Sequence, residues 1–309
     1  MTEKKAENIS IILPVYNEEL GIESVLNDIY TVIKDITYNC EVLIIDDGST
    51  DNTLELAAKF PVSIYQHPNN LGYGAALKTG LAHANNDIIC IVDADGTYPV
   101  KDIPKLVNTL IEKDMDMVVG ARVNANAAIP AIRKPAKWVL GQLAKLSVGV
   151  KIPDINSGFR VFKRDAAINF INLLPNGFSF TTTITLAMLN NQYSVKYVPI
   201  DYYHRIGKSK ISPFRDTTKF LLLITRIALY FAPLKVFLSM SFIMMLFALF
   251  WGIFSLLVLG KLADISTLVI FLSAIQIGAI GLIAEHINHR LSNEYHKARM
   301  RPLLKEKDK

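Results

Sequence analysis

Two long apolar runs near the C-terminal end constrain the fold of this chain more than any other feature. Leu234–Leu259 carries a single charged residue, Lys235, and Ile265–Ala284 carries none. At a rise of about 1.5 Å per residue, either run would cross a hydrocarbon layer of roughly 30 Å as a helix. We therefore predict two transmembrane helices within residues 232–287, joined by a turn at Gly260–Asp264. The alternative is a pair of core helices buried in a soluble protein.

Positive charge gathers on one side of this predicted hairpin. Its flanks carry Lys219, Arg226, Lys235, Arg290, Lys297, Arg299 and Arg301, whereas the turn carries only Lys261 and Asp264. Because Lys and Arg are in excess in cytoplasmic loops, we expect residues 1–212 and the basic tail 288–309 to be cytoplasmic, in a protein of the plasma membrane, the inner membrane or an equivalent one. The net charge of +5 is modest and lies near the spans, which favours lipid head groups or phosphates over nucleic acid as partners.

Strands and helices alternate along the first part of the chain. The predicted strands are Ile9–Pro14, Glu41–Ile45, Val62–Gln66, the run from Ile88, and Met117–Gly120, with helices at Ile22–Asp35, at Leu54–Lys59 and from Gly74 to Ala84. Strand Arg160–Lys163, helix Thr182–Asn191 and strand Ser194–Ile200 follow. This order predicts an α/β domain with a mostly parallel sheet over residues 1–212.

The stretch Ile88–Pro99, IICIVDADGTYP, reads as a buried strand that runs into Asp93 and Asp95 and then a glycine turn. Alternate residues of a strand point to the same side, so we expect both carboxylates to converge at its carboxyl end. Hard oxygen ligands suit Mg²⁺ or Mn²⁺, which complete their shell with water and substrate phosphates. The stretch therefore favours a nucleoside diphosphate as ligand, with an acidic turn of no function as the alternative.

Polar residues also follow the other predicted strands, at Pro14–Glu19, Asp46–Thr53 and Asn69–Gly74. In open α/β sheets the ligand crevice lies outside the carboxyl ends of the strands, so we expect these segments to meet in one cleft. Gly72-Tyr73-Gly74 is too isolated to indicate a dinucleotide site.

Taken together, PVYNEE at Pro14–Glu19, DDGSTDNT at Asp46–Thr53 and DADG at Asp93–Gly96 resemble a family 2 glycosyltransferase of the GT-A fold. DINSGFR at Asp154–Arg160 and RIGKSK at Arg205–Lys210 further resemble the branch that transfers a sugar to dolichyl or undecaprenyl phosphate. The resemblance covers about residues 9–212, and a two-helix hairpin also fits that branch.

The resemblance implies a role for individual residues of this chain. The donor nucleotide-sugar would be held by Pro14, Tyr16, Glu18, Asp46, Asp47, Asp93, Ala94 and Asp95, with Mg²⁺ or Mn²⁺ on Asp93 and Asp95. The acceptor phosphate and the diphosphate would be held by Arg122, Arg160, Arg205, Lys208 and Lys210. The groups closest to the chemistry would be Asp154, Asp95 and Arg122.

In the family, the residue at the position of Asp154 is the proposed base or acceptor-positioning carboxylate. Because a lipid phosphate is already ionised near neutral pH, we expect Asp154 to act mainly by orientation and by balancing the arginines. A plain Asx turn is the alternative reading.

Three further segments lie outside the predicted sheet, and two of them have two readings each. Residues 131–150 are predicted to form an amphipathic helix, packed on the sheet or lying in the membrane surface. Residues 201–212 are a basic lid over the phosphates or a solvated charge run, and 213–231 lead into the first span as an amphipathic helix.

We predict an inverting transferase that moves one sugar from a nucleotide-sugar to a polyprenyl phosphate on the cytoplasmic membrane face. Mannosyl enzymes of the branch carry a Gln where this chain has Thr97 and an acidic residue where it has Thr181–Thr183, which favours UDP-Glc, UDP-GlcNAc or UDP-GalNAc as donor. The alternatives are a polysaccharide-extending synthase of the same fold and a non-catalytic nucleotide-sugar-binding scaffold. The sequence leaves the oligomeric state open, with a homo-oligomer among the alternatives.

Overall fold

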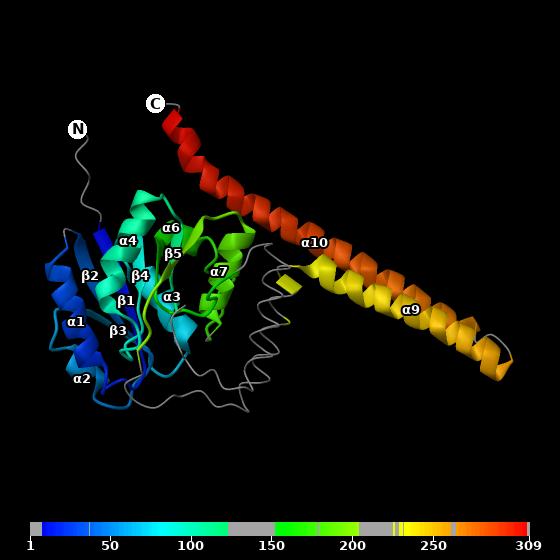
Figure 1. The fold of residues 1–309 in the computed structure, drawn as a ribbon, viewed down its shortest axis with the longest axis horizontal. Helices are drawn as coiled ribbons and strands as arrows, with labels where there is room; N and C mark the ends of the chain where they lie inside the picture. Colours follow the sequence, from blue (N-terminus) through cyan, green and yellow to red (C-terminus); the bar gives the residue numbers. More distant parts are fainter. Residues whose placement is uncertain are drawn as a thin grey trace. The chain divides into compact units, whose positions relative to one another are not determined.

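The computed structural model describes residues 8–36, 38–122, 152–177, 179–203, 225, 229–230, 232–260 and 264–307. The chain divides into two compact units, one containing the sheet and the other the two long C-terminal helices (Figure 1). The predicted helix at 131–150, the basic residues Arg205, Lys208 and Lys210, and most of 213–231 lie outside the described residues.

The first unit is built on one sheet in the order β3-β2-β1-β4-β6-β5-β7. Its strands are β1 (Asn8–Val15), β2 (Asn39–Asp46), β3 (Ser63–Gln66), β4 (Ile88–Ile91), β5 (Met117–Ala121), β6 (Arg160–Lys163) and β7 (Val195–Pro199). β6 is antiparallel to β4 and β5, and every other pair is parallel. The prediction of a mostly parallel sheet is therefore confirmed.

Helices cover both faces of this sheet. They are α1 (Ile22–Lys34), α2 (Thr53–Ala57), α3 (Tyr73–His83), α4 (Ile103–Glu112, after a short 3₁₀ turn at Val100–Asp102), α6 (Arg164–Ile168) and α7 (Phe180–Asn190). Alternate residues of β1, such as Ile9 and Ile11, share a core with the apolar faces of α1 and α4. Ile12 points the other way, where Gly80 of α3 approaches its side chain. The period of two along β1 thus sorts its side chains between the two helical layers.

The second unit contains α9 (Pro233–Leu259) and α10 (Asp264–Lys307), which lie side by side (Figure 1). Pro233–Val258 and Ile265–Asn288 have mean hydropathies of 2.3 and 2.2, and only 22% and 11% of their apolar windows are buried. Such exposure does not fit the core helices of a soluble protein, and both segments are long and apolar enough to cross a membrane.

Small and polar residues form the contact between these two helices. The Ser241 hydroxyl donates to the carbonyl oxygen of Ala274 over 2.7 Å, and Gly281 lies so close to Phe237 that a methyl group there would be 2.6 Å from its Cβ. Close approach at small residues and interhelical hydrogen bonds are typical of helix pairs in lipid. α10 continues without a break beyond the predicted span to Lys307, so much of the predicted tail 288–309 is helical.

Replacing Ile11 by Ala should destabilise the first unit by about 2–5 kcal/mol, because Ile11 is fully buried and the change leaves a cavity in the core. Native-state hydrogen exchange of β1 and β2 peptides in the full chain should accelerate by roughly 30-fold or more. Leu20→Ala is the control, because Leu20 is 70% exposed, and it should shift stability by no more than about 0.5 kcal/mol. Equal exchange in both variants would contradict the core assignment.

Candidate active site

The loops that follow β1 and β2 are joined at the carboxyl edge of the sheet. The backbone N–H of Asn17 donates to the Ser49 hydroxyl over 2.9 Å, and the side chain of Asn17 accepts from the N–H of Thr50 over 2.7 Å. The N–H of Glu18 donates to the Thr53 hydroxyl over 2.8 Å. The structure thus brings two of the predicted donor-binding segments, Pro14–Glu19 and Asp46–Thr53, into direct contact.

Asp47 fixes a third loop against these two. Its carboxylate is 4% exposed and accepts from the backbone N–H groups of Leu71 and Gly72 over 2.9 and 2.8 Å. It also lies 2.8 Å from Nδ1 of His67, whose Nε2 contacts the hydroxyl of Thr79. Sequence reasoning placed Asp47 at the nucleoside, and that role stays a prediction. These contacts show that the carboxylate holds the loop before α3.

The remaining predicted donor residues lie on the same edge. Asp46 ends β2, is fully buried, and accepts from the N–H of Ser49 over 3.1 Å. Pro14 is buried near the end of β1, Tyr16 and Glu18 follow it half-buried, and Ala94 is buried between the two predicted metal ligands. Their contact with a nucleotide stays a prediction.

Asp93 and Asp95 lie beyond the end of a strand and not on it. β4 ends at Ile91, the N–H of Val92 still donates to Ile12 of β1, and the chain then turns at Ala94 and Asp95, with Gly96 at a φ of +72°. The expectation that strand alternation aligns the two carboxylates was therefore wrong, and hydrogen bonds orient them instead. Asp93 accepts from the Tyr73 hydroxyl over 3.0 Å, and Asp95 accepts from the N–H and hydroxyl of Thr97 over 3.1 and 2.6 Å.

The carboxylate oxygens of Asp93 and Asp95 suit a divalent cation whose remaining ligands come from a substrate and water. Among the described residues no group of three or more His, Cys, Asp or Glu side chains is suited to hold a metal. Mg²⁺ is usually held by one or two carboxylates, and substrate phosphates and water supply the rest of its shell. A pair of carboxylates such as Asp93 and Asp95 is consistent with that pattern.

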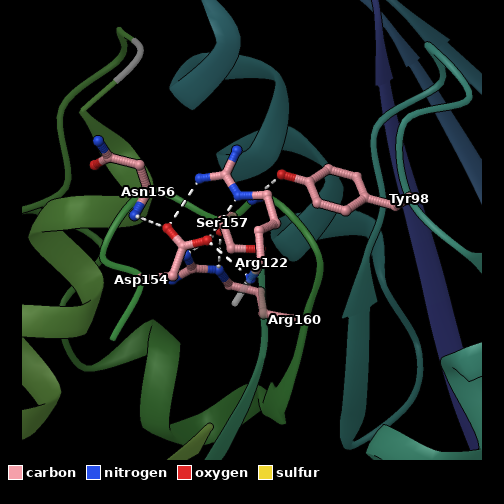
Figure 2. A network of polar contacts seen from close by, with 7 residues as sticks. Tyr98, Arg122, Asp154, Asn156, Ser157 and Arg160 are labelled. Atoms are coloured by element: carbon pink, nitrogen blue, oxygen red, sulfur yellow. Dashed lines mark hydrogen bonds and ion pairs between the residues drawn. The ribbon is translucent and has the colours of Figure 1, made fainter. Parts of the chain in front are cut away.

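Arg122 and Asp154 form a bidentate ion pair (Figure 2). Nε and Nη2 of Arg122 donate to the two Asp154 oxygens over 2.6 and 2.9 Å, and the N–H of Asn156 donates to Asp154 over 3.2 Å. The guanidinium lies 5.2 Å from the ring centre of Tyr202. The structure therefore brings together two residues that the sequence predicted to act near the acceptor.

Both partners of this pair stay charged near neutral pH. Burial by itself raises the pKa of Asp154, but the hydrogen bonds and charge of Arg122 outweigh it and bring that pKa below the usual value of 3.8. Burial likewise lowers the pKa of Arg122, and the contact with Asp154 outweighs it and raises that pKa. A carboxylate that is so firmly ionised is a weak base.

The sequence assigned Arg160 to the acceptor phosphate and the diphosphate, and that role stays a prediction. Its side chain is fully buried, and its guanidinium donates to the carbonyl oxygens of Ser157 and Thr181 and to the Thr185 hydroxyl. Burial lowers its pKa. Phosphate binding by Arg160 is untested, but its burial and its main-chain partners count against it. We assign it instead to joining the Asp154–Gly158 loop to α7.

Sequence reasoning missed two tyrosines of the site. The Tyr98 hydroxyl accepts from the N–H of Gly158 over 2.8 Å, and Figure 2 shows its ring directed toward the loop that carries Asp154. Tyr73 donates to Asp93, and burial together with the charge of Asp93 raises its pKa. Tyr98 directly follows Thr97, and Tyr73 directly follows Gly72. Their position next to these motif residues was the available sequence signal.

Two family models match the chain. Residues 10–170 match the model described as glycosyl transferase family 2, and residues 232–289 match the GtrB C-terminal hairpin. The first match covers β1 to β6, apart from the first two residues of β1, and the second covers most of the apolar helix pair. They confirm the predicted resemblance.

Relatives and solved structures agree with these matches. The chain is 30% identical over 215 residues to a dolichyl-phosphate hexose transferase of Haloferax volcanii, covering 69% of this chain and 91% of that protein. It is 28% identical to an undecaprenyl-phosphate 4-deoxy-4-formamido-L-arabinose transferase of Photorhabdus laumondii, covering 98% and 94%. Its fold matches glucosyl-3-phosphoglycerate synthase from Mycobacterium tuberculosis, crystallised with Mn²⁺ and UDP, with a TM-score of 0.58 at 21% identity over 72% and 78%. The predicted GT-A fold is thereby confirmed, and the chain belongs to glycosyl transferase family 2.

Proposed function

We propose that this protein is an inverting glycosyltransferase that moves one sugar from a UDP-sugar to a polyprenyl phosphate, undecaprenyl or dolichyl, at the cytoplasmic face of a membrane. The proposal rests on the contact between the loop of Asp154–Arg160 and the loop of Asp93. Gly158 of the Asp154–Arg160 segment lies so close to Asp93 that a Cβ there would be 2.6 Å from its Oδ2. The segment expected to serve the acceptor thus abuts the segment expected to serve the donor.

The relatives support this class of reaction. Proteins named as dolichyl-phosphate and undecaprenyl-phosphate sugar transferases match most of the chain, and a dodecaprenyl-phosphate galacturonate synthase of Rhizobium johnstonii matches 90% of it at 26% identity. The sugars in these names differ. The shared element is the polyprenyl phosphate, which we take as the acceptor class here.

Asp93 and Asp95 would hold Mg²⁺ or Mn²⁺ together with the donor diphosphate. A divalent ion there offsets the negative charge that develops on the leaving nucleoside diphosphate. Thr97 stands where mannosyl enzymes of the branch carry a Gln, and its hydroxyl is bound to Asp95. That difference supports a UDP-sugar, with UDP-Glc, UDP-GlcNAc and UDP-GalNAc as the candidates.

Arg122 would face the acceptor phosphate. Its contacts with Asp154 fix the plane of the guanidinium, and a planar guanidinium suits a phosphate. Asp154 would then act by orienting Arg122. The acceptor phosphate oxygen is already ionised near neutral pH, so it can attack the anomeric carbon without a strong base.

A transfer assay with the purified full chain tests the proposal. The mixture holds Mg²⁺ or Mn²⁺, undecaprenyl or dolichyl phosphate, and labelled UDP- or GDP-sugars, and label is counted in the lipid extract. We expect label from one UDP-sugar, abolished by EDTA and restored by added metal. Label in a water-soluble saccharide, and none in lipid, would contradict the acceptor assignment and favour a saccharide-extending synthase.

Replacing Asp95 by Asn should lower the transfer rate by about 100-fold or more, because the change removes a charged oxygen ligand next to the diphosphate. The rate of label transfer to lipid measures the effect. Asp114→Asn is the matched control: it makes the same change at an exposed ion pair with Lys163 and should leave the rate nearly unchanged. Near-normal transfer by Asp95→Asn would remove Asp95 from the metal site.

The pH dependence of the rate separates an orienting Asp154 from a catalytic base. Because the pKa of Asp154 is held below 3.8, this carboxylate stays ionised from pH 5 to 8. The stability it contributes is therefore present above the unfolded pKa of about 3.9 and is lost only as the pH falls through the lower folded value. We expect kcat/KM to show no acidic limb from Asp154 above about pH 5.

Arg122→Met provides the contrast. Without the guanidinium, the pKa of Asp154 should rise, although the backbone N–H groups of residues 122 and 156 still bind its carboxylate. Because the acceptor phosphate loses its guanidinium partner and Asp154 no longer has an arginine to orient, kcat should fall and no acidic limb should appear. An acidic limb near pH 6–7 in the unmodified protein, absent in Asp154→Asn, would instead identify Asp154 as a base.

A further inference from the structure

The side chain of Asp93 is enclosed from two sides. The hydroxyl of Tyr73, the first residue of α3, donates to Oδ1 over 3.0 Å. Gly158 lies against the same carboxylate, at the position where a Cβ would be 2.6 Å from Oδ2 and 3.0 Å from Oδ1. A carboxylate between a hydrogen-bond donor and a packed backbone has little freedom to rotate.

The backbone that carries Tyr73 is itself held on both sides. Asp47 binds the N–H groups of Leu71 and Gly72, directly before it. Gly72 has a φ of +106° and lies against the backbone of Asn176, whose carbonyl oxygen also accepts from the N–H of Ala75 over 3.0 Å. The start of α3 is therefore fixed by two separate loops, and the Tyr73 hydroxyl is held at a set place.

We propose that Tyr73 is a positioning residue for the cation site: its hydroxyl holds Asp93 in the orientation that binds Mg²⁺ or Mn²⁺ together with a nucleoside diphosphate. This inference rests on the proposed function. Tyr73 does not touch the cation. It acts through Asp93, as groups that hydrogen-bond a metal ligand do, and the loss of such groups usually weakens metal binding by about 10–100-fold.

The test is direct binding of Mn²⁺ to the full chain in detergent, in the presence of UDP, followed by the electron paramagnetic resonance signal of free Mn²⁺. Tyr73→Phe keeps the ring and removes only the hydroxyl, so we expect Kd for Mn²⁺ to rise by about 10–100-fold. In the transfer assay the same variant should need more Mg²⁺ for half-maximal rate and recover much of its kcat at saturating metal.

Tyr193→Phe is the matched control. Tyr193 is also buried, and its hydroxyl accepts from the side-chain amide of Asn169 over 3.2 Å, away from Asp93. This variant should bind Mn²⁺ as the unmodified protein does. Equal weakening in both tyrosine variants would trace the effect to general destabilisation and overturn the inference.

Asp93→Ala separates the inference from the proposed function. If the unmodified protein binds Mn²⁺ and Asp93→Ala does not, but Tyr73→Phe binds it with unchanged Kd, the positioning role is overturned and the metal site stands. If the unmodified protein with UDP binds no Mn²⁺, the metal part of the proposed function fails, and the inference fails with it.

Discussion

The hydrogen bonds of the buried Arg160 guanidinium are the interaction on which the position of the Asp154–Gly158 loop depends. A charged group removed from water is costly unless its hydrogen-bonding capacity is used. Here that capacity goes to the carbonyl oxygens of Ser157 and Thr181, which belong to the loop after Asp154 and to α7. Displacement of the loop would remove the Ser157 carbonyl oxygen from the buried charge and leave that charge with its partners on α7. The position of Asp154, and through it of Arg122, therefore follows from a residue that lies beneath the site.

The donor side is organised by the same physical rule, with a carboxylate in place of the guanidinium. Asp47 is buried and its oxygens are used by backbone N–H groups of Leu71 and Gly72 and by His67. It joins the loops after β2 and β3, while the Tyr73 hydroxyl extends the arrangement to Asp93. Two buried charged groups, one of each sign, thus fix the loops on either side of the turn that carries Asp93 and Asp95.

How much could be predicted from the sequence depended on the range of the interaction. The alternation of strands and helices along the chain predicted the mostly parallel sheet correctly, and hydropathy predicted the two C-terminal helices, because both patterns are local. The place of Asp93 beyond the end of β4 depends on where pairing with β1 and β6 stops. The burial of Arg160 and the Tyr73 contact join segments that are far apart along the chain, and no spacing of residues encodes them. The partners of the charged residues could therefore not be predicted from the sequence, and the two tyrosines were missed.

The charges of the site and of its proposed substrates bear directly on the chemistry of transfer. Asp93, Asp95 and Asp154 are carboxylates in one region, and the proposed substrates, a diphosphate and a lipid phosphate, bring further negative charge. Arg122 is already paired with Asp154, and Arg160 is bound to the main chain below. Because both arginines already have partners within the protein, the negative charges of Asp93, Asp95 and the donor diphosphate would repel one another strongly in a partly buried site. A divalent cation held by Asp93 and Asp95 would offset this excess of negative charge and stabilise the charge that develops on the leaving nucleotide.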